Sequence, residues 1–162
     1  TPIRSITHGA DQEHGLRPGT ENVALIVALG AAAALAHASL PAFTAQLRTL
    51  RDRLHVQLQA GVPGLRLNGH PDQRLPNTLY VSFPGIGGRN LLAEASDTVA
   101  ASVGSACHSE QDAVSGVLAA MGFDAERATG AVRLSVGRTT QTVDVDKAAE
   151  ALFAAWNRLT RQ

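Results

Sequence analysis

The sequence predicts an α/β domain, in which a small, mainly antiparallel four-stranded sheet is covered by helices and preceded by a pair of long helices. Two observations support this fold class. Apolar residues recur at helical spacing in stretches near both ends of the chain, and short β-branched or aromatic runs lie between those stretches. The 162 residues are 44% hydrophobic and 17% charged, so the chain is long and apolar enough to bury a core.

The helix pair is predicted from residues 21–58. Residues 1–19 lack periodicity and are expected to form a loop, after which Thr20 is expected to cap a helix over about 21–37. This helix is apolar nearly all round and is therefore predicted to be buried, and its longest apolar run (23–36) is too short to span a membrane. After Pro41, apolar residues at spacings of three and four predict a second, amphipathic helix: Phe43, Leu47, Leu50, Leu54 and Leu58.

The remaining elements alternate between strands and helices. Strands are predicted at 65–70, 77–83, 98–103 and 131–136. Short helices are expected at 89–96, around 114–121 and near 124–129. A closing helix has an apolar face from Val145 to Leu159, with Asp144 and Asp146 at its positive end.

Charge and cysteine content exclude several classes of protein. Fourteen basic residues balance fourteen acidic ones, so neither a nucleic-acid surface nor a polybasic membrane surface is expected. Near-zero charge is compatible with an oligomer. The single cysteine excludes an internal disulfide, and the N-terminus lacks the pattern of a signal peptide, so the cytoplasm is the expected compartment. No spacing typical of a metal or nucleotide site occurs, so no metal is predicted.

Cys107, in the stretch VGSACHSEQD (103–112), has two interpretations. A free cysteine is most often a small buried hydrophobe. Here small residues precede it, a polar run follows it and a helix comes next, which favours an accessible thiol with thiolate character. His108 either supplies positive charge or a proton to this thiol, or points into solvent.

Arginines form the second feature, because Arg133 and Arg138 lie in and just after a predicted strand. A guanidinium buried in a sheet requires an anion, so one interpretation is a structural salt bridge or an edge-strand position. The other is a forked donor that binds a carboxylate at two points. The stretch GLRPGTEN (15–22) is similarly open: it is either a capped helix start or an anion site made of backbone N–H groups.

Four runs together resemble the C-terminal part of the cysteine desulfurase and selenocysteine lyase group of class V, fold-type I PLP enzymes. They occur in the family's order: HGADQEHGLRPGTEN (8–22), RLPNTLYVSF (74–83), VGSACHSE (103–110) and GAVRLSVGRTT (130–140). The resemblance implies the small C-terminal domain of that fold. It also implies a pyridoxal phosphate cofactor, L-cysteine or L-selenocysteine as substrate, a homodimer and a sulfur-acceptor protein.

The resemblance also implies roles for individual residues. Cys107 matches the nucleophile that takes the sulfur and becomes a persulfide, and Arg133 matches the arginine that holds the substrate carboxylate. Thr20, with Gly19, resembles the threonine loop that reaches the partner's cofactor phosphate. His108 and Asn77 are candidate supporting residues.

The chain departs from the family pattern in two ways. The loop at 9–13 has one glycine where the family usually has three, and His14 replaces a common arginine. The Schiff-base lysine of the family lies upstream of this loop, whereas the only lysine here is Lys147, in the closing helix. We therefore expect residues 1–22 to be a remnant of the large PLP domain and 23–162 to be the small domain, with a catalytic cysteine loop at 104–112. The alternative is a non-catalytic interaction or sulfur-acceptor module.

Overall fold

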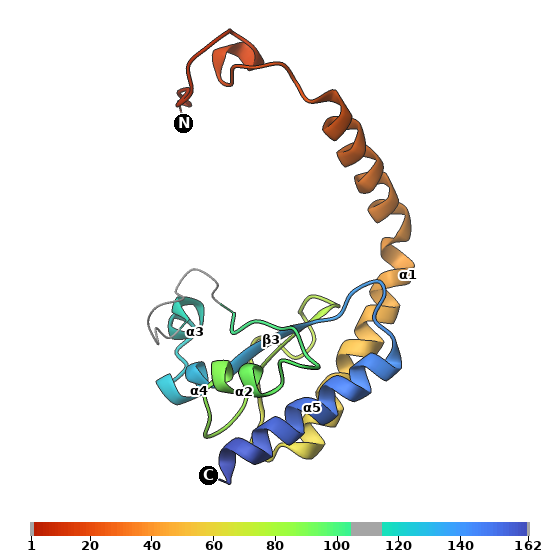
Figure 1. Ribbon diagram of the computed structural model, residues 1–162, viewed down its shortest axis with the longest axis vertical. Helices are drawn as coiled ribbons and strands as arrows, with labels where there is room; N and C mark the ends of the chain where they lie inside the picture. The colour runs from red at the N-terminus through yellow and green to blue at the C-terminus, as the bar shows by residue number, and fades with distance from the viewer. Residues whose placement is uncertain (1, 105–114, 162) are drawn as a thin grey trace. The chain divides into compact units, whose positions relative to one another are not determined.

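A computed structural model describes residues 2–104 and 115–161 (Figure 1). Its elements are, in chain order, η1 (Glu13–Gly15), α1 (Val23–Gly61), β1 (Arg66–Leu67), β2 (Thr78–Ser82), α2 (Gly88–Glu94), α3 (Gly116–Ala120), α4 (Ala125–Thr129), β3 (Ala131–Ser135) and α5 (Thr142–Thr160). The chain divides into two compact units, residues 1–40 and 41–162. The expected division at residue 22 stays a prediction.

The N-terminal unit begins with a loop that ends at the start of α1. The side-chain Oδ1 of Asn22 accepts a hydrogen bond of 3.1 Å from the backbone N–H of Leu25. Asn22 therefore caps the helix, and the prediction that Thr20 does so is wrong by two residues. Asparagine and threonine both serve as N-caps, so the type of residue alone did not settle the position.

The predicted helix pair is also wrong, because α1 continues from Val23 to Gly61 with Pro41 inside it. Proline removes one backbone hydrogen bond and crowds the preceding turn, at a cost of about 3 kcal/mol, which is why a break was expected. The residues around Pro41 include several alanines and leucines, which favour helix, and the helix continues through the proline.

Within the described chain, the first half of α1 is exposed, contrary to the prediction of a buried helix. Leu29 is 72% exposed and Leu25 is 66% exposed, although both are large and apolar. The run at 23–36 is too short by itself to span a membrane, but the helix continues beyond it, and an 18-residue window of α1 reaches a mean hydropathy of 2.1. By length and composition α1 therefore meets the criterion for a membrane-spanning helix, contrary to that expectation. A helix that packs against another domain or subunit meets the same criterion, so the criterion alone does not identify a membrane span.

Within residues 2–104 and 115–161 the sheet has three strands rather than the predicted four, in the order β1-β2-β3 with both pairs antiparallel. Residues 98–103 form only an isolated bridge, in which Ser102 pairs with Arg133. This segment, Thr-Val-Ala-Ala-Ser-Val, contains two alanines, which offer little side chain to pack across a sheet.

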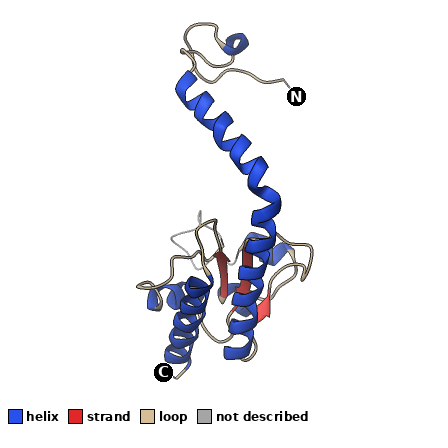
Figure 2. Ribbon diagram, turned by 90° about the vertical axis from the view of Figure 1, so that its right-hand side faces the viewer, coloured by secondary structure: helices blue, strands red, loops and turns tan. Residues whose placement is uncertain are grey.

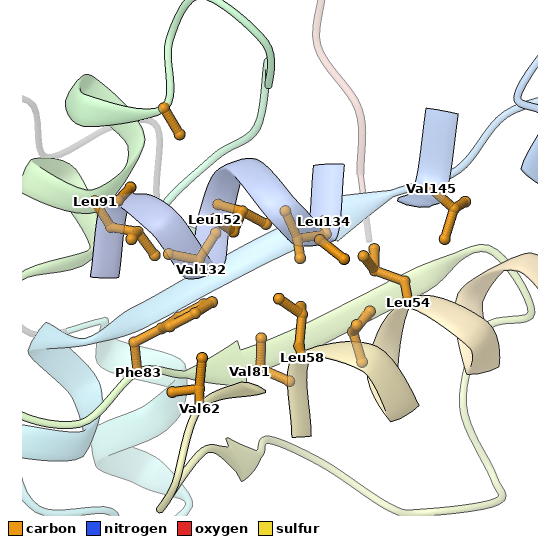
Figure 3. Packing of buried hydrophobic residues seen from close by; sticks show 14 of the residues in the cluster. Leu54, Leu58, Val62, Val81, Phe83, Leu91, Val132, Leu134, Val145 and Leu152 are labelled. Atoms are coloured by element: carbon orange, nitrogen blue, oxygen red, sulfur yellow. The ribbon is translucent and has the colours of Figure 1, made fainter. Parts of the chain in front are cut away.

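The main core lies on one face of the sheet. Alternate residues of β2 and β3, among them Val81, Val132 and Leu134, point into it (Figure 3). They pack against leucines from the second half of α1 and against α5, whose apolar face begins at Val145 as predicted. Figure 2 shows the strands together with these two long helices.

The opposite face of the sheet is only partly covered. A smaller cluster of Leu118, Ala128 and Ala131, joined by Tyr80 and Phe123, seals one end under α3 and α4. Further along β3, Arg133 and Ser135 on this face are exposed. Among the described residues, this part of the sheet face is therefore not covered by another helix.

A buried cation cluster attaches the loop before β2 to α1. The Arg51 guanidinium is buried and donates to the carboxylate of Asp52 at 2.8 Å and to the backbone carbonyl of Leu75, also at 2.8 Å. Arg74 reaches the same carboxylate at 3.3 Å. One side chain of α1 thus holds the loop that leads into β2, and so helps to position the sheet.

We expect Leu58→Ala to destabilise the chain by about 3 kcal/mol, because Leu58 is fully buried in the main core and its truncation leaves a cavity. Val56→Ala, on the same helix, is the matched control and should change stability by less than about 0.5 kcal/mol, since Val56 is 64% exposed. Urea unfolding followed by circular dichroism measures both. Equal effects would contradict the assignment of the core.

His55, which lies near the charges of this cluster, predicts a pH dependence of stability. Burial lowers the pKa of His55 below its ordinary value, with a further contribution from Arg74 and Arg51 that Asp52 partly opposes. Protonation therefore favours the unfolded chain, so this contribution to stability is complete above about pH 6.5 and is lost as the pH falls towards the folded-state pKa. The urea midpoint should fall from pH 7 to pH 5 less steeply in His55→Gln than in the unmodified chain. His37→Gln, at an exposed position on α1, is the control and should keep the full slope.

Candidate functional site

The candidate site is centred on Arg133, in the middle of β3. In the β2–β3 register Arg133 lies directly opposite Tyr80, so the two side chains share the partly uncovered face of the sheet. The Arg133 backbone also exchanges hydrogen bonds with Ser102, with N–O distances of 2.6 and 3.3 Å. Arg133 is thus paired with Tyr80 on one side and with Ser102 on the other, while its side chain stays exposed.

Gly104 lies against both of these side chains. Arg133 Nη1 donates to the carbonyl of Gly104 at 3.3 Å, and the Gly104 N–H donates to the Ser102 hydroxyl at 3.2 Å. Gly104 has a φ of 95°, in the left-handed region that favours glycine. A Cβ added there would lie 2.6 Å from the hydroxyl oxygen of Tyr80, so the close approach also requires glycine.

Tyr80 is a site residue that the sequence reasoning missed. Burial raises the pKa of its hydroxyl above the ordinary value, and this outweighs the opposing effects of Ser115 and of the Arg133 charge. Although Ser115 is near enough to affect the pKa, the Tyr80 hydroxyl has no well-formed hydrogen bond within residues 2–104 and 115–161. The sequence does contain a pattern that could have identified Tyr80. Side chains alternate between the two faces along β2, so Tyr80 lies on the face opposite the core residues Leu79 and Val81.

Of the residues predicted to act, Cys107 and His108 lie outside the described residues. The structure places Arg133 on the uncovered face, as a carboxylate-binding role needs, whereas Arg138 follows the strand and stacks over Phe43 at 5.5 Å. Asn77 precedes β2; its backbone carbonyl accepts from Val136, and its side chain accepts from the Thr78 hydroxyl at 3.3 Å. Its supporting role stays a prediction.

Gly19 and Thr20 belong to the N-terminal unit and are exposed there. Gly19 has a φ of 101°, its N–H donates to Gln12 Oε1 at 3.1 Å, and its carbonyl accepts from Arg17 at 2.9 Å. The turn therefore has a defined backbone and leaves the Thr20 hydroxyl accessible. This arrangement is compatible with contact to a phosphate group.

The residues present fit only part of a pyridoxal phosphate site. The cofactor needs a lysine to hold its aldehyde, and the single lysine, Lys147, lies exposed on α5. Thr20 and Gly19 offer a hydroxyl and a glycine turn for the phosphate, and Arg133 offers a cation for a substrate carboxylate. The one lysine of the sequence therefore lies on a different element from the residues that offer these groups.

Comparison with known proteins identifies the class to which this fold and site belong. The class-V aminotransferase family matches residues 4–148, which is most of the chain. The chain is a member of that family. The chain superimposes on the solved structure of a NifS-like protein from Rickettsia africae with a TM-score of 0.82 and 26% sequence identity, covering 97% of this chain and 41% of that one.

Two groups of curated relatives are about equally similar to this chain. It is 40% identical over 153 residues to the cysteine desulfurase IscS of Clostridium botulinum, covering 93% of this chain. It is also 40% identical over 165 residues to the selenocysteine lyase of Rattus norvegicus, covering 98% of this chain. The chain spans 38% of the length of either relative.

Gly104→Ala should disrupt the bridge between Ser102 and Arg133, because the added methyl group meets the Tyr80 hydroxyl and the φ of 95° strains an alanine. We expect a loss of about 1–3 kcal/mol in local stability. Amide hydrogen exchange at Arg133 measures it. Gly116→Ala is the matched control, since nothing lies within 4 Å of its added Cβ, and it should leave this exchange unchanged. Unchanged protection in Gly104→Ala would contradict the described packing.

Proposed function

We propose that this chain is a segment of a PLP-dependent cysteine desulfurase, and that it provides the sulfur-accepting thiol and the carboxylate-binding arginine. One observation carries the proposal: the Arg133 guanidinium lies on the uncovered sheet face where the segment containing Cys107 begins and ends. Gly104 precedes that segment and accepts a hydrogen bond from Arg133, and Ser115 follows it and lies near Tyr80. A substrate held at Arg133 is therefore close to both ends of the cysteine segment.

The proposed reaction transfers one sulfur atom. The Cys107 thiolate attacks the substrate sulfur; a sulfur–sulfur bond forms as the carbon–sulfur bond breaks, and the carbon product leaves as alanine once a proton is added to carbon. When bound, pyridoxal phosphate stabilises the negative charge left on carbon. The balanced result is that cysteine and an enzyme thiol give alanine and an enzyme persulfide. Arg133 keeps the carboxylate in place throughout.

Several further features belong to the same proposal. The lysine that anchors the cofactor comes from outside residues 1–162, and Thr20 with Gly19 contacts the cofactor phosphate of a partner subunit in a homodimer. Selenocysteine lyase activity is the alternative within the family, supported by the equal similarity to the two groups of relatives. We also propose a sulfur-acceptor protein as the onward partner and the cytoplasm as the compartment.

A second candidate function is a non-catalytic interaction or sulfur-acceptor module. It is favoured by the exposed position of the only lysine and by the exposed apolar first half of α1. Adding pyridoxal phosphate to the 162-residue chain distinguishes between the two candidate functions. A visible absorption band from cofactor bound to lysine would contradict the proposal that the anchoring lysine lies elsewhere. Mass spectrometry of Cys107 after exposure to a persulfide donor tests the acceptor role.

Cys107→Ala tests the proposed function in the full-length protein that contains this segment. The variant should keep the absorbance of the bound cofactor, because the thiol does not anchor it. It should lose persulfide formation and nearly all alanine release from L-cysteine, measured by mass spectrometry and by alanine assay. The control is Val56→Ala, at an exposed position on α1, which should retain both. Unchanged alanine release in Cys107→Ala would remove Cys107 from the mechanism.

A further inference from the structure

The hydroxyl of Tyr80 is a buried polar group without a described partner. Its oxygen is inaccessible to solvent and forms no well-formed hydrogen bond within residues 2–104 and 115–161, although Ser115 lies near enough to lower its pKa. A buried donor left in this state is costly, and a native structure usually provides a ligand or a neighbouring group to satisfy it. This hydroxyl therefore points to something that binds next to it.

The neighbours of the hydroxyl specify the charge of that ligand. Tyr80 and Arg133 are directly paired across β2 and β3, and both side chains contact Gly104, whose carbonyl accepts from Arg133. Arg133 has five N–H donors, and one bond of 3.3 Å to this carbonyl is its only side-chain bond among the described residues. A guanidinium with spare donors beside a neutral phenol is suited to an anion with two acceptor atoms.

Protonation of Tyr80 is consistent with the role of a donor. A tyrosine hydroxyl is ordinarily protonated at neutral pH, and burial raises the pKa of this one in spite of Ser115 and the nearby Arg133 charge. Phe would fill the same space on the sheet without the donor. The hydroxyl is therefore separable from the ring by mutation.

We propose that Tyr80 is a second binding residue for the substrate carboxylate, donating its O–H to one oxygen while Arg133 binds the other. This inference rests on the proposed function, since it assigns the anion as the α-carboxylate of the amino acid that Arg133 holds. A hydroxyl and a guanidinium on adjacent strands approach the carboxylate from different directions and limit its rotation. Tyr80 thereby orients the substrate as well as binding it.

The test compares Tyr80→Phe with the unmodified full-length protein that contains this segment. Isothermal titration calorimetry with propionate, which carries a carboxylate but no sulfur, measures binding without turnover. We expect Tyr80→Phe to bind propionate about tenfold more weakly, the loss of one hydrogen bond to a charged acceptor. The KM for L-cysteine should rise about tenfold with kcat changed less than about twofold. Propionamide, the neutral analogue, should discriminate little between the two proteins.

A matched control removes a hydroxyl elsewhere. Thr49→Val loses a hydroxyl whose hydrogen bond among the described residues is to the carbonyl of Ala45 within α1, and it should leave propionate binding and KM unchanged. If the Phe variant does not fold, Tyr80→Leu, which lacks the ring as well as the hydroxyl, is a second variant without the donor, and its propionate and propionamide affinities are compared in the same way.

The outcomes separate this inference from the function on which it rests. If Arg133→Ala weakens propionate binding and Tyr80→Phe does not, Tyr80 has no part in carboxylate binding and the inference is overturned. If Tyr80→Phe weakens propionate and propionamide equally, the effect comes from packing, which overturns it as well. If Arg133→Ala binds propionate as tightly as the unmodified protein, the proposed role of Arg133 fails, and the inference fails with it.

Discussion

The antiparallel pairing of β2 with β3 is the constraint on which the candidate site depends. Its register sends Val81, Val132 and Leu134 into the main core and leaves Tyr80 and Arg133 on the other face. A slip of one residue would bury the guanidinium and expose the leucine and valines, so the hydrophobic core itself holds the register. The position of the cation is thus a direct consequence of burying the apolar side chains.

Two contacts extend this constraint to the neighbouring loops. The Arg51 guanidinium binds the carbonyl of Leu75, three residues before β2, and so couples the start of that strand to α1. On the other side, Gly104 lies within reach of both Arg133 and Tyr80 because it carries no side chain. Gly104, the last described residue before position 105, therefore lies beside Arg133.

The sequence predicted the parts of this arrangement that depend on local pattern. The amphipathic second half of α1, the strands β2 and β3 and the apolar face of α5 follow from residue spacing, and Arg133 was found because arginine is unusual inside a strand. It missed features that depend on partners distant in the chain. Tyr80 was assigned to a strand, but only the register places it beside Arg133. The fourth strand was overpredicted because periodicity does not show whether a segment finds a full set of pairing partners.

The exposed half of α1 connects the fold to the proposed function. Seven large apolar residues between Val23 and Leu40 are more than half exposed, on a helix whose other half is firmly packed: Val23, Leu25, Ile26, Val27, Leu29, Leu35 and Leu40. Apolar surface of this extent is costly in water, so these side chains favour burial against further protein. Under the proposed function the segment works together with further protein, and the exposed apolar face of α1 is a surface of the kind that such an arrangement needs.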